Sequence, residues 1–172
     1  MKKNQNDIVT KPDCLEINVL YKNFKNGELN FFPSLEQSFV LDKKKYSHFI
    51  ALVLSDMPVP MIYISEEKNG KEYVIDGQNR FNYFFSFIDG GFELTGLREY
   101  KELNGLNFNQ LSEELKKKIL AYKIIVNRFK NESGNDLRQE IFMRLGDAEF
   151  SLMNEVYKKA KESNWIFQFS KN

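Results

Sequence analysis

The feature that most constrains the fold is a change of hydrophobic period on either side of Asp76-Gly77. The preceding run, Tyr73-Val74-Ile75, is aromatic and β-branched, which is typical of a buried strand. The following apolar residues recur at the spacing of one helix face: Phe81, Phe84, Phe85 and Ile88. Gly90-Gly91 then predicts the end of the helix. A strand that leads directly into a helix points to a fold in which the two kinds of element interleave.

The same periodicities place the other elements. The predicted strands are Cys14–Leu20, Val59–Ser65, Glu72–Ile75 and Tyr122–Phe129, the last of them well buried. Asn26-Gly27 predicts a turn, and Lys68-Asn69-Gly70-Lys71 predicts a hairpin between the second and third strands.

Four further segments have helical patterns. They are 42–55 with Asp42 as N-cap, 112–119 opened by Ser112, a helix capped by Asn135 or Ser133 whose buried face holds Leu137, Ile141, Phe142 and Leu145, and 152–161. Residues 92–108 fit loops or short strands equally well. The predicted class is therefore α/β or α+β, with a small mixed sheet flanked by helices.

Composition bounds the function. The 172 residues suit one domain, predicted over 14–162, between a flexible lead (1–13) and a C-terminal tail (163–172). The net charge of +1 gives no global attraction to nucleic acid or membrane. No apolar run is long enough to span a membrane, the N-terminus lacks a signal-peptide pattern, and Cys14 is the only cysteine, so we expect a cytoplasmic protein. His48 is the only histidine, which argues against a zinc site or a histidine-based nuclease.

The corner at Asp76–Arg80 has the chemistry of an anion site. A helix that begins right after a strand presents its first backbone N–H groups and the positive end of its dipole. Gly77 has no Cβ to keep a phosphate away, and Arg80 is one turn in. Gln78 can orient a phosphate oxygen, a metal-bound water or an attacking water, and Asp76 can hold a divalent cation or cap the helix. The competing interpretation is an ordinary Asp-Gly turn with a solvated arginine.

A resemblance favours the first interpretation. Asp76-Gly77-Gln78-Asn79-Arg80 resembles the Asp-Gly-Gln-Gln-Arg motif of the GmrSD restriction endonuclease N-terminal domain family, which has the ParB/sulfiredoxin-like fold. Four other segments resemble that family in the same order: Met57–Tyr63, Leu111–Leu115 followed by Tyr122–Ile124, Ile141–Leu145 and Leu152–Ala160. The resemblance spans roughly residues 14–162. It implies a nucleotide-phosphate site at the corner, with Gly77, Asn79, Arg80, Arg144 and Gln37 as binding residues and Asp76, Gln78 and Arg80 as catalytic residues.

This chain departs from the family pattern around the corner. Glu36 and Gln37 stand where the family has Gln and Arg, Asn79 replaces a Gln, and Gly146 replaces an Asn. These changes leave nucleotide binding better supported than hydrolysis.

The resemblance implies an NTP-binding, and in the catalytic case NTP-hydrolysing, module of a modification-dependent restriction or phage-defence system. NTP and Mg²⁺ are the expected ligands. An HNH-type nuclease is the expected partner and would bring the DNA, since this chain has no histidine pair for that chemistry. The alternative is a catalytically degenerate module of the same fold that binds protein or DNA.

Overall fold

The computed structural model of the protein describes residues 10–31 and 42–131, together with Ile141 and Met143. The chain divides into two compact units, Met1–Glu132 and Ser133–Asn172. Residues 1–9 of the predicted lead, the helices at 133–145 and 152–161 and the tail lie outside the described residues, apart from the helical positions 141 and 143. The last part of the predicted lead, 10–13, is instead part of a strand, Thr10–Glu16.

The strands and the main helices belong to the first unit. In chain order they are β1 (Thr10–Glu16), α1 (Ile17–Lys25), β2 (Leu29–Phe31), α2 (Lys43–Leu54), β3 (Ile62–Glu67), β4 (Glu72–Asp76), α3 (Gln78–Ile88), the 3₁₀ turns η3 (Lys101–Leu103) and η4 (Phe108–Gln110), α4 (Glu113–Ala121) and β5 (Lys123–Asn131). In this part of the chain, no helix is both long and apolar enough to cross a membrane.

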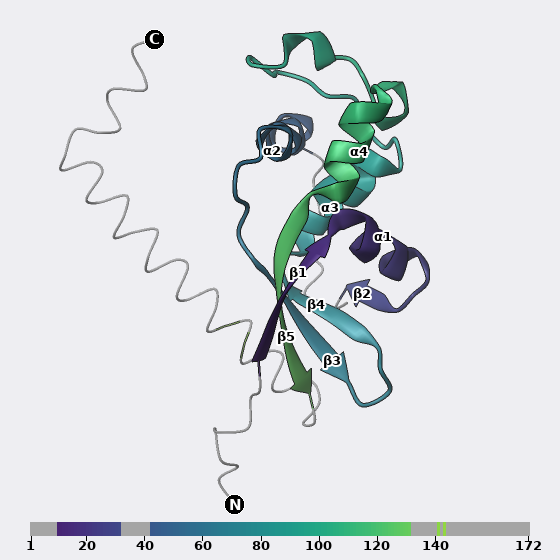
Figure 1. Ribbon diagram of the computed structural model, residues 1–172, viewed down its shortest axis with the longest axis vertical. Coiled ribbons are helices and arrows are strands. Elements are labelled where there is room, and N and C mark those ends of the chain that lie inside the picture. Colours follow the sequence, from purple (N-terminus) through teal and green to yellow (C-terminus); the bar gives the residue numbers. More distant parts are fainter. Residues whose placement is uncertain (1–9, 32–41, 132–140, 142, 144–172) are drawn as a thin grey trace, which may run out of the picture. The chain divides into compact units, whose positions relative to one another are not determined.

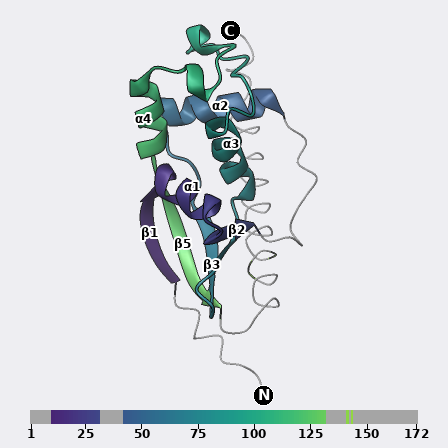
Figure 2. The ribbon, with the colours of Figure 1, turned by 90° about the vertical axis from the view of Figure 1, so that its right-hand side faces the viewer.

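The five strands form one mixed sheet in the order β1-β5-β3-β4-β2. Two neighbouring pairs are antiparallel, β1 with β5 and β3 with β4, and two are parallel, β5 with β3 and β4 with β2. In both ribbon views α2, α3 and α4 gather toward one end of the sheet, and the turn between β3 and β4 lies at the other (Figures 1 and 2). The predicted α+β class with a small mixed sheet is therefore confirmed.

Most predicted elements are found close to their expected bounds. Asp42 caps α2 by accepting hydrogen bonds from two backbone amides, those of Lys44 and Lys45. Ser112 caps α4 through the amide of Leu115. Gly70 has the left-handed backbone that the turn between β3 and β4 requires. Local side-chain chemistry was thus sufficient to place these ends.

The predicted strand at Cys14–Leu20 is wrong in its second half, because α1 begins at Ile17. The alternation of Leu15, Ile17 and Val19 suggested a strand, but Ile17 and Leu20 also lie on one helix face and are completely buried there. The strand prediction for β5 needs a smaller correction. Ile125 is 49% exposed, since it lies on the opposite face from the buried residues Ile124 and Val126.

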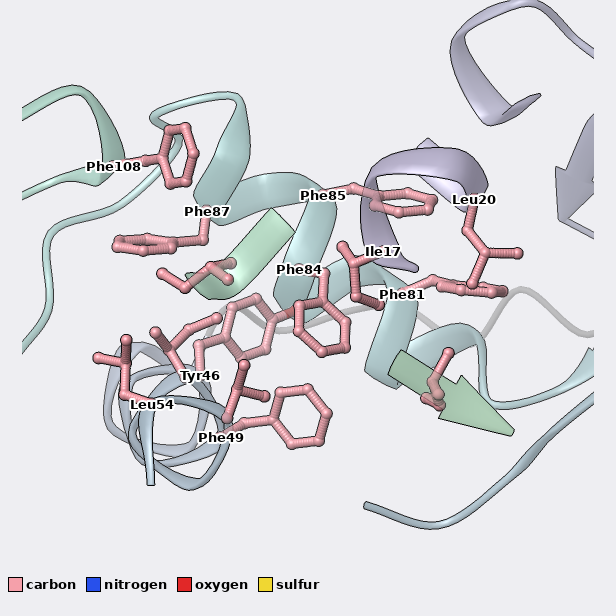
Figure 3. Packing of buried hydrophobic residues seen from close by; sticks show 14 of the residues in the cluster. Ile17, Leu20, Tyr46, Phe49, Leu54, Phe81, Phe84, Phe85, Phe87 and Phe108 are labelled. Atoms are coloured by element: carbon pink, nitrogen blue, oxygen red, sulfur yellow. The ribbon is translucent and has the colours of Figure 1, made fainter. Parts of the chain in front are cut away.

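Four phenylalanine rings of α3 lie in the core, those of Phe81, Phe84, Phe85 and Phe87. Figure 3 shows Phe81 and Phe85 beside Ile17 and Leu20 of α1, and Phe84 facing α2. The rings of Phe81 and Phe85 stack at 5.1 Å between centroids, and Phe84 meets Phe49 edge-on at 5.0 Å. The helix face predicted from the spacing of Phe81, Phe84 and Phe85 is therefore confirmed as part of the core. The core fixes α3, and with it the corner that opens the helix.

Candidate functional site

The corner between β4 and α3 has the predicted strand–glycine–helix form. Strand β4 ends at Asp76, Gly77 is the N-cap, and α3 begins at Gln78. Gly77 has φ +98°, a left-handed backbone that turns the chain from the sheet into the helix. Because glycine has no side chain, the first backbone N–H groups of α3 donate no hydrogen bond to the side chain of the N-cap residue. Asp76 does not cap the helix, contrary to one of the two roles considered for it.

Gly77 also makes room for a neighbouring side chain. A Cβ built at this position would lie 2.8 Å from Arg80 Nη1 and 2.9 Å from Ile62 Cγ1. The space beside the Gly77 Cα atom is therefore filled by the guanidinium and by the first residue of β3. Because Gly77 has no Cβ, the guanidinium of Arg80 can occupy this space.

Asp76 and Arg80 form an ion pair across the corner. Arg80 Nη1 lies 3.2 Å and Nη2 3.4 Å from Asp76 Oδ2. The pair is partly buried, with the two side chains 14% exposed for Arg80 and 23% exposed for Asp76. The guanidinium is thus oriented at the start of α3, and a carboxylate lies directly beside it.

Gln78 is directed into the protein. Its side chain amide Nε2 donates to the backbone oxygen of Val74 at 3.1 Å, and the residue is only 7% exposed. This contact fixes which end of the amide faces Val74, since a carbonyl accepts and does not donate. Gln78 Oε1 is buried without a hydrogen-bond partner. The predicted water-orienting residue therefore holds the end of β4 to the start of α3.

The remaining predicted site residues are not gathered at the corner by the described structure. Asn79 is exposed at the start of α3. Gln37 and Arg144 lie outside the described residues. Asp76, Gly77, Gln78 and Arg80 are thus the predicted residues that the structure brings together.

A β-bulge in β4 brings two further polar residues into line with Asp76. Ile64 opposes Val74 but Tyr63 opposes Asp76, so Ile75 is the extra residue on β4. Without that insertion, Asp76 would face the fully buried Ile62 on the apolar side of the sheet. The bulge therefore keeps the carboxylate out of the core.

The residue next to Tyr63 on the other side is Asn127 of β5. Asp76, Tyr63 and Asn127 therefore form one row across three strands. Asn127 Oδ1 is buried without a hydrogen-bond partner. Sequence reasoning missed Tyr63 and Asn127, because pairing between strands distant in the chain leaves no local signal.

No family model, curated protein or solved structure compared with this chain matches it. The resemblance to the GmrSD N-terminal domain family therefore stays a prediction. In the described part of the chain, no three His, Cys, Asp or Glu side chains gather as metal ligands. Among the described residues of the corner, Asp76 supplies the carboxylate.

Proposed function

We propose that this chain is a cytoplasmic nucleoside-triphosphate-binding protein whose phosphate site is the β4–α3 corner. In this proposal it belongs to a modification-dependent restriction or phage-defence system and acts with a separate HNH-type nuclease, which supplies the contacts to DNA. The observation that carries the proposal is the corner itself, where α3 starts directly after left-handed Gly77 and Arg80 lies one turn further on.

Three groups support phosphate binding at this position. The first amides of α3 point out of the helix end, where the dipole favours an anion. Arg80 is tied to the corner by its contact with Asp76 and offers a planar fork of donors suited to phosphate oxygens. Mg²⁺, when bound with the nucleotide, neutralises charge on the phosphates, and Asp76 is the carboxylate placed to hold it.

A second candidate is a binding module without catalysis. It is favoured by Gln78, whose buried side chain amide is engaged with the Val74 carbonyl instead of facing solvent. A module of this kind would bind the nucleotide, or a protein or DNA partner, without releasing phosphate. Measuring whether phosphate is released from the nucleotide distinguishes the hydrolysing protein from the binding module.

Thermal unfolding with each of the four nucleoside triphosphates and Mg²⁺ tests the proposal. A ligand that binds only the folded state raises its stability, by about 2.7 kcal/mol at a ligand concentration one hundred times Kd. The wild type should show a rise in Tm with at least one nucleotide, and Arg80→Ala should show none. Arg98→Ala, at an exposed loop position, is the matched control and should respond like the wild type.

Phosphate release is measured on the same proteins. Release by the wild type that is lost in Arg80→Ala supports hydrolysis, whereas a Tm shift without release supports the binding module. A folded wild-type protein whose Tm responds to none of the four nucleotides contradicts both forms of nucleotide binding.

A further inference from the structure

Three turns of the protein contain the same dipeptide, Asn-Gly, at residues 26–27, 69–70 and 104–105. In such a pair the backbone nitrogen of glycine can attack the side-chain amide of asparagine with little hindrance, because glycine has no Cβ. The attack closes a five-membered imide ring and releases ammonia. In all three pairs the glycine N–H donates to a backbone oxygen, at 2.8 to 3.1 Å. The structure separates the pairs by how it holds each asparagine.

Asn69 lies in the exposed turn between β3 and β4 (Figure 1). Its Oδ1 accepts a hydrogen bond from the backbone nitrogen of Lys71 at 3.0 Å. This bond stabilises the negative charge that develops on Oδ1 when the Cγ atom is attacked. Within the described part of the chain, Nδ2, the nitrogen that would leave as ammonia, donates to no other group. The Asn69 amide is therefore polarised for attack while its leaving group is unrestrained.

Asn104 is held at both ends of its amide. Its Oδ1 accepts from the backbone nitrogen of Leu97 at 2.9 Å, and its Nδ2 donates to the backbone oxygens of Leu97 and Lys101 at 3.0 and 3.2 Å. Ring closure with the nitrogen of Gly105 requires the amide to leave these partners. The fold therefore protects the third pair.

Asn26 is restrained through its backbone. It is the C-cap residue of α1, with φ −82° and ψ −6°, and its N–H donates to the oxygens of Lys22 and Phe24. At a helical ψ the next backbone nitrogen points away from the side chain, so ring closure requires the end of α1 to unwind. The first pair is therefore also slower to react than the pair in the β3–β4 turn.

We propose that Asn69 is a site of spontaneous conversion to aspartate and isoaspartate in the folded protein. The Gly70 nitrogen bonds to Asn69 Cγ, the bond from Cγ to Nδ2 breaks, and ammonia leaves with the proton of the Gly70 nitrogen. Water then adds to one of the two imide carbonyls and opens the ring. The product has a carboxylate in place of a neutral amide, which lowers the formal net charge of +1 by one. The site is separate from the β4–α3 corner and independent of the proposed function.

Peptide mapping by mass spectrometry tests this on the full chain, aged at mildly alkaline pH either folded or in guanidinium chloride. Chymotrypsin cleaves after aromatic residues and places the pairs in peptides 25–31, 64–73 and 101–108. In the folded protein the 69–70 pair should convert fastest. The 104–105 pair should convert at least about tenfold more slowly, because the hydrogen bonds of Asn104 must open first. In guanidinium chloride the three rates should converge.

Asn69→Gln is the matched variant, since it keeps the amide but would have to close a larger ring. It should lose the conversion in peptide 64–73 and leave the other two peptides unchanged. Circular dichroism of each aged sample checks that the folded arm stayed folded.

Conversion at 69–70 that is no faster than at 104–105 in the folded protein would contradict the proposal. Faster conversion at 26–27 than at 69–70 would place the reactive site at the end of α1 and would be equally contrary to it. If the rates differ as much in guanidinium chloride as in buffer, neighbouring side chains and not the fold set the order, and the proposal is wrong.

Discussion

Gly77 illustrates how a single residue meets two separate demands. Its backbone has φ +98°, a region that side chains with a Cβ rarely adopt. In addition, a Cβ would fall within 3 Å of both Arg80 Nη1 and Ile62 Cγ1. The first demand is typical of a strand-to-helix turn and follows from the sequence. The second is a packing demand that depends on where β3 and Arg80 lie.

Gly77→Ala should lower the free energy of unfolding by about 2 to 5 kcal/mol. The figure combines the cost of a left-handed backbone, about 1 to 2 kcal/mol, with the cost of an overpacked site, about 1 to 3 kcal/mol. Chemical denaturation monitored by circular dichroism measures the change.

Gly105→Ala is the control for this substitution. Gly105 also has a positive φ, +87°, but a Cβ there meets no atom within 4 Å. Gly105→Ala should lower the free energy of unfolding by the backbone cost alone, about 1 to 2 kcal/mol. Equal losses in the two variants would show that the contacts with Arg80 and Ile62 are not tight.

At the scale of elements, a polar cluster ties α1 to the end of α3. Lys25 Nζ lies 2.9 Å from Asp89 Oδ2, and the Tyr21 hydroxyl donates to Asp89 Oδ1. Burial by itself raises the pKa of Asp89, but the hydrogen bonds from Lys25 and Tyr21 and the charge of Lys25 outweigh it and hold that pKa below its ordinary value. Burial and the hydrogen bond to Asp89 raise the pKa of Tyr21. The cluster explains part of why 17–25 is a helix docked on its neighbours and not a continued strand.

The lowered pKa of Asp89 gives a pH-dependent stability. The contribution of Asp89 is present above the unfolded-state pKa of 3.8 and is lost as the pH falls through the lower folded-state pKa. The Tm of the wild type should therefore exceed that of Asp89→Asn at neutral pH, and the gap should close in strong acid. Calorimetry across an acid pH series measures it.

Glu99→Gln, which changes an exposed loop acid, is the control and should show a smaller gap at neutral pH. A difference between wild type and Asp89→Asn that stays constant with pH would mean that the carboxylate charge is not what holds α1 to α3.

At the scale of the whole molecule, one aromatic core joins the helices to the sheet. Phe84 is completely buried, and its ring meets Phe49 of α2 (Figure 3). The Phe84 ring also meets that of Tyr122, which precedes β5. Tyr122 in turn donates its hydroxyl to the Met57 carbonyl at 2.8 Å. Because segments far apart in sequence meet at Phe84, removing its ring should destabilise the packing of the entire first unit.

Phe84→Ala should destabilise the protein by about 3 to 5 kcal/mol, the usual cost of deleting a buried phenylalanine ring. Leu52→Ala on α2 is the control, since Leu52 is 42% exposed, and it should cost well under half as much. Urea denaturation of both variants gives the comparison. A loss at Phe84 no larger than that at Leu52 would mean that the ring is not part of a tightly packed core.

The sequence by itself determined the elements whose signals are local. Asp42 and Ser112 mark helix starts by capping, Gly70 and Gly77 mark turns by backbone freedom, and the phenylalanine spacing of α3 marks its buried face. The α+β class and the strand–glycine–helix corner followed from these signals, because each depends on residues within one or two turns of chain.

Tertiary structure decided what depends on contacts between distant segments. Residues 17–20 satisfy both a strand and a helix pattern, and packing of Ile17 and Leu20 against the core selected the helix. The sheet order, the bulge at Ile75, the row of Asp76, Tyr63 and Asn127, and the inward turn of Gln78 likewise arise from pairing and burial. The pairings that set the sheet order, such as Tyr63 with Asn127, join residues tens of positions apart, so no local pattern of side chains records them.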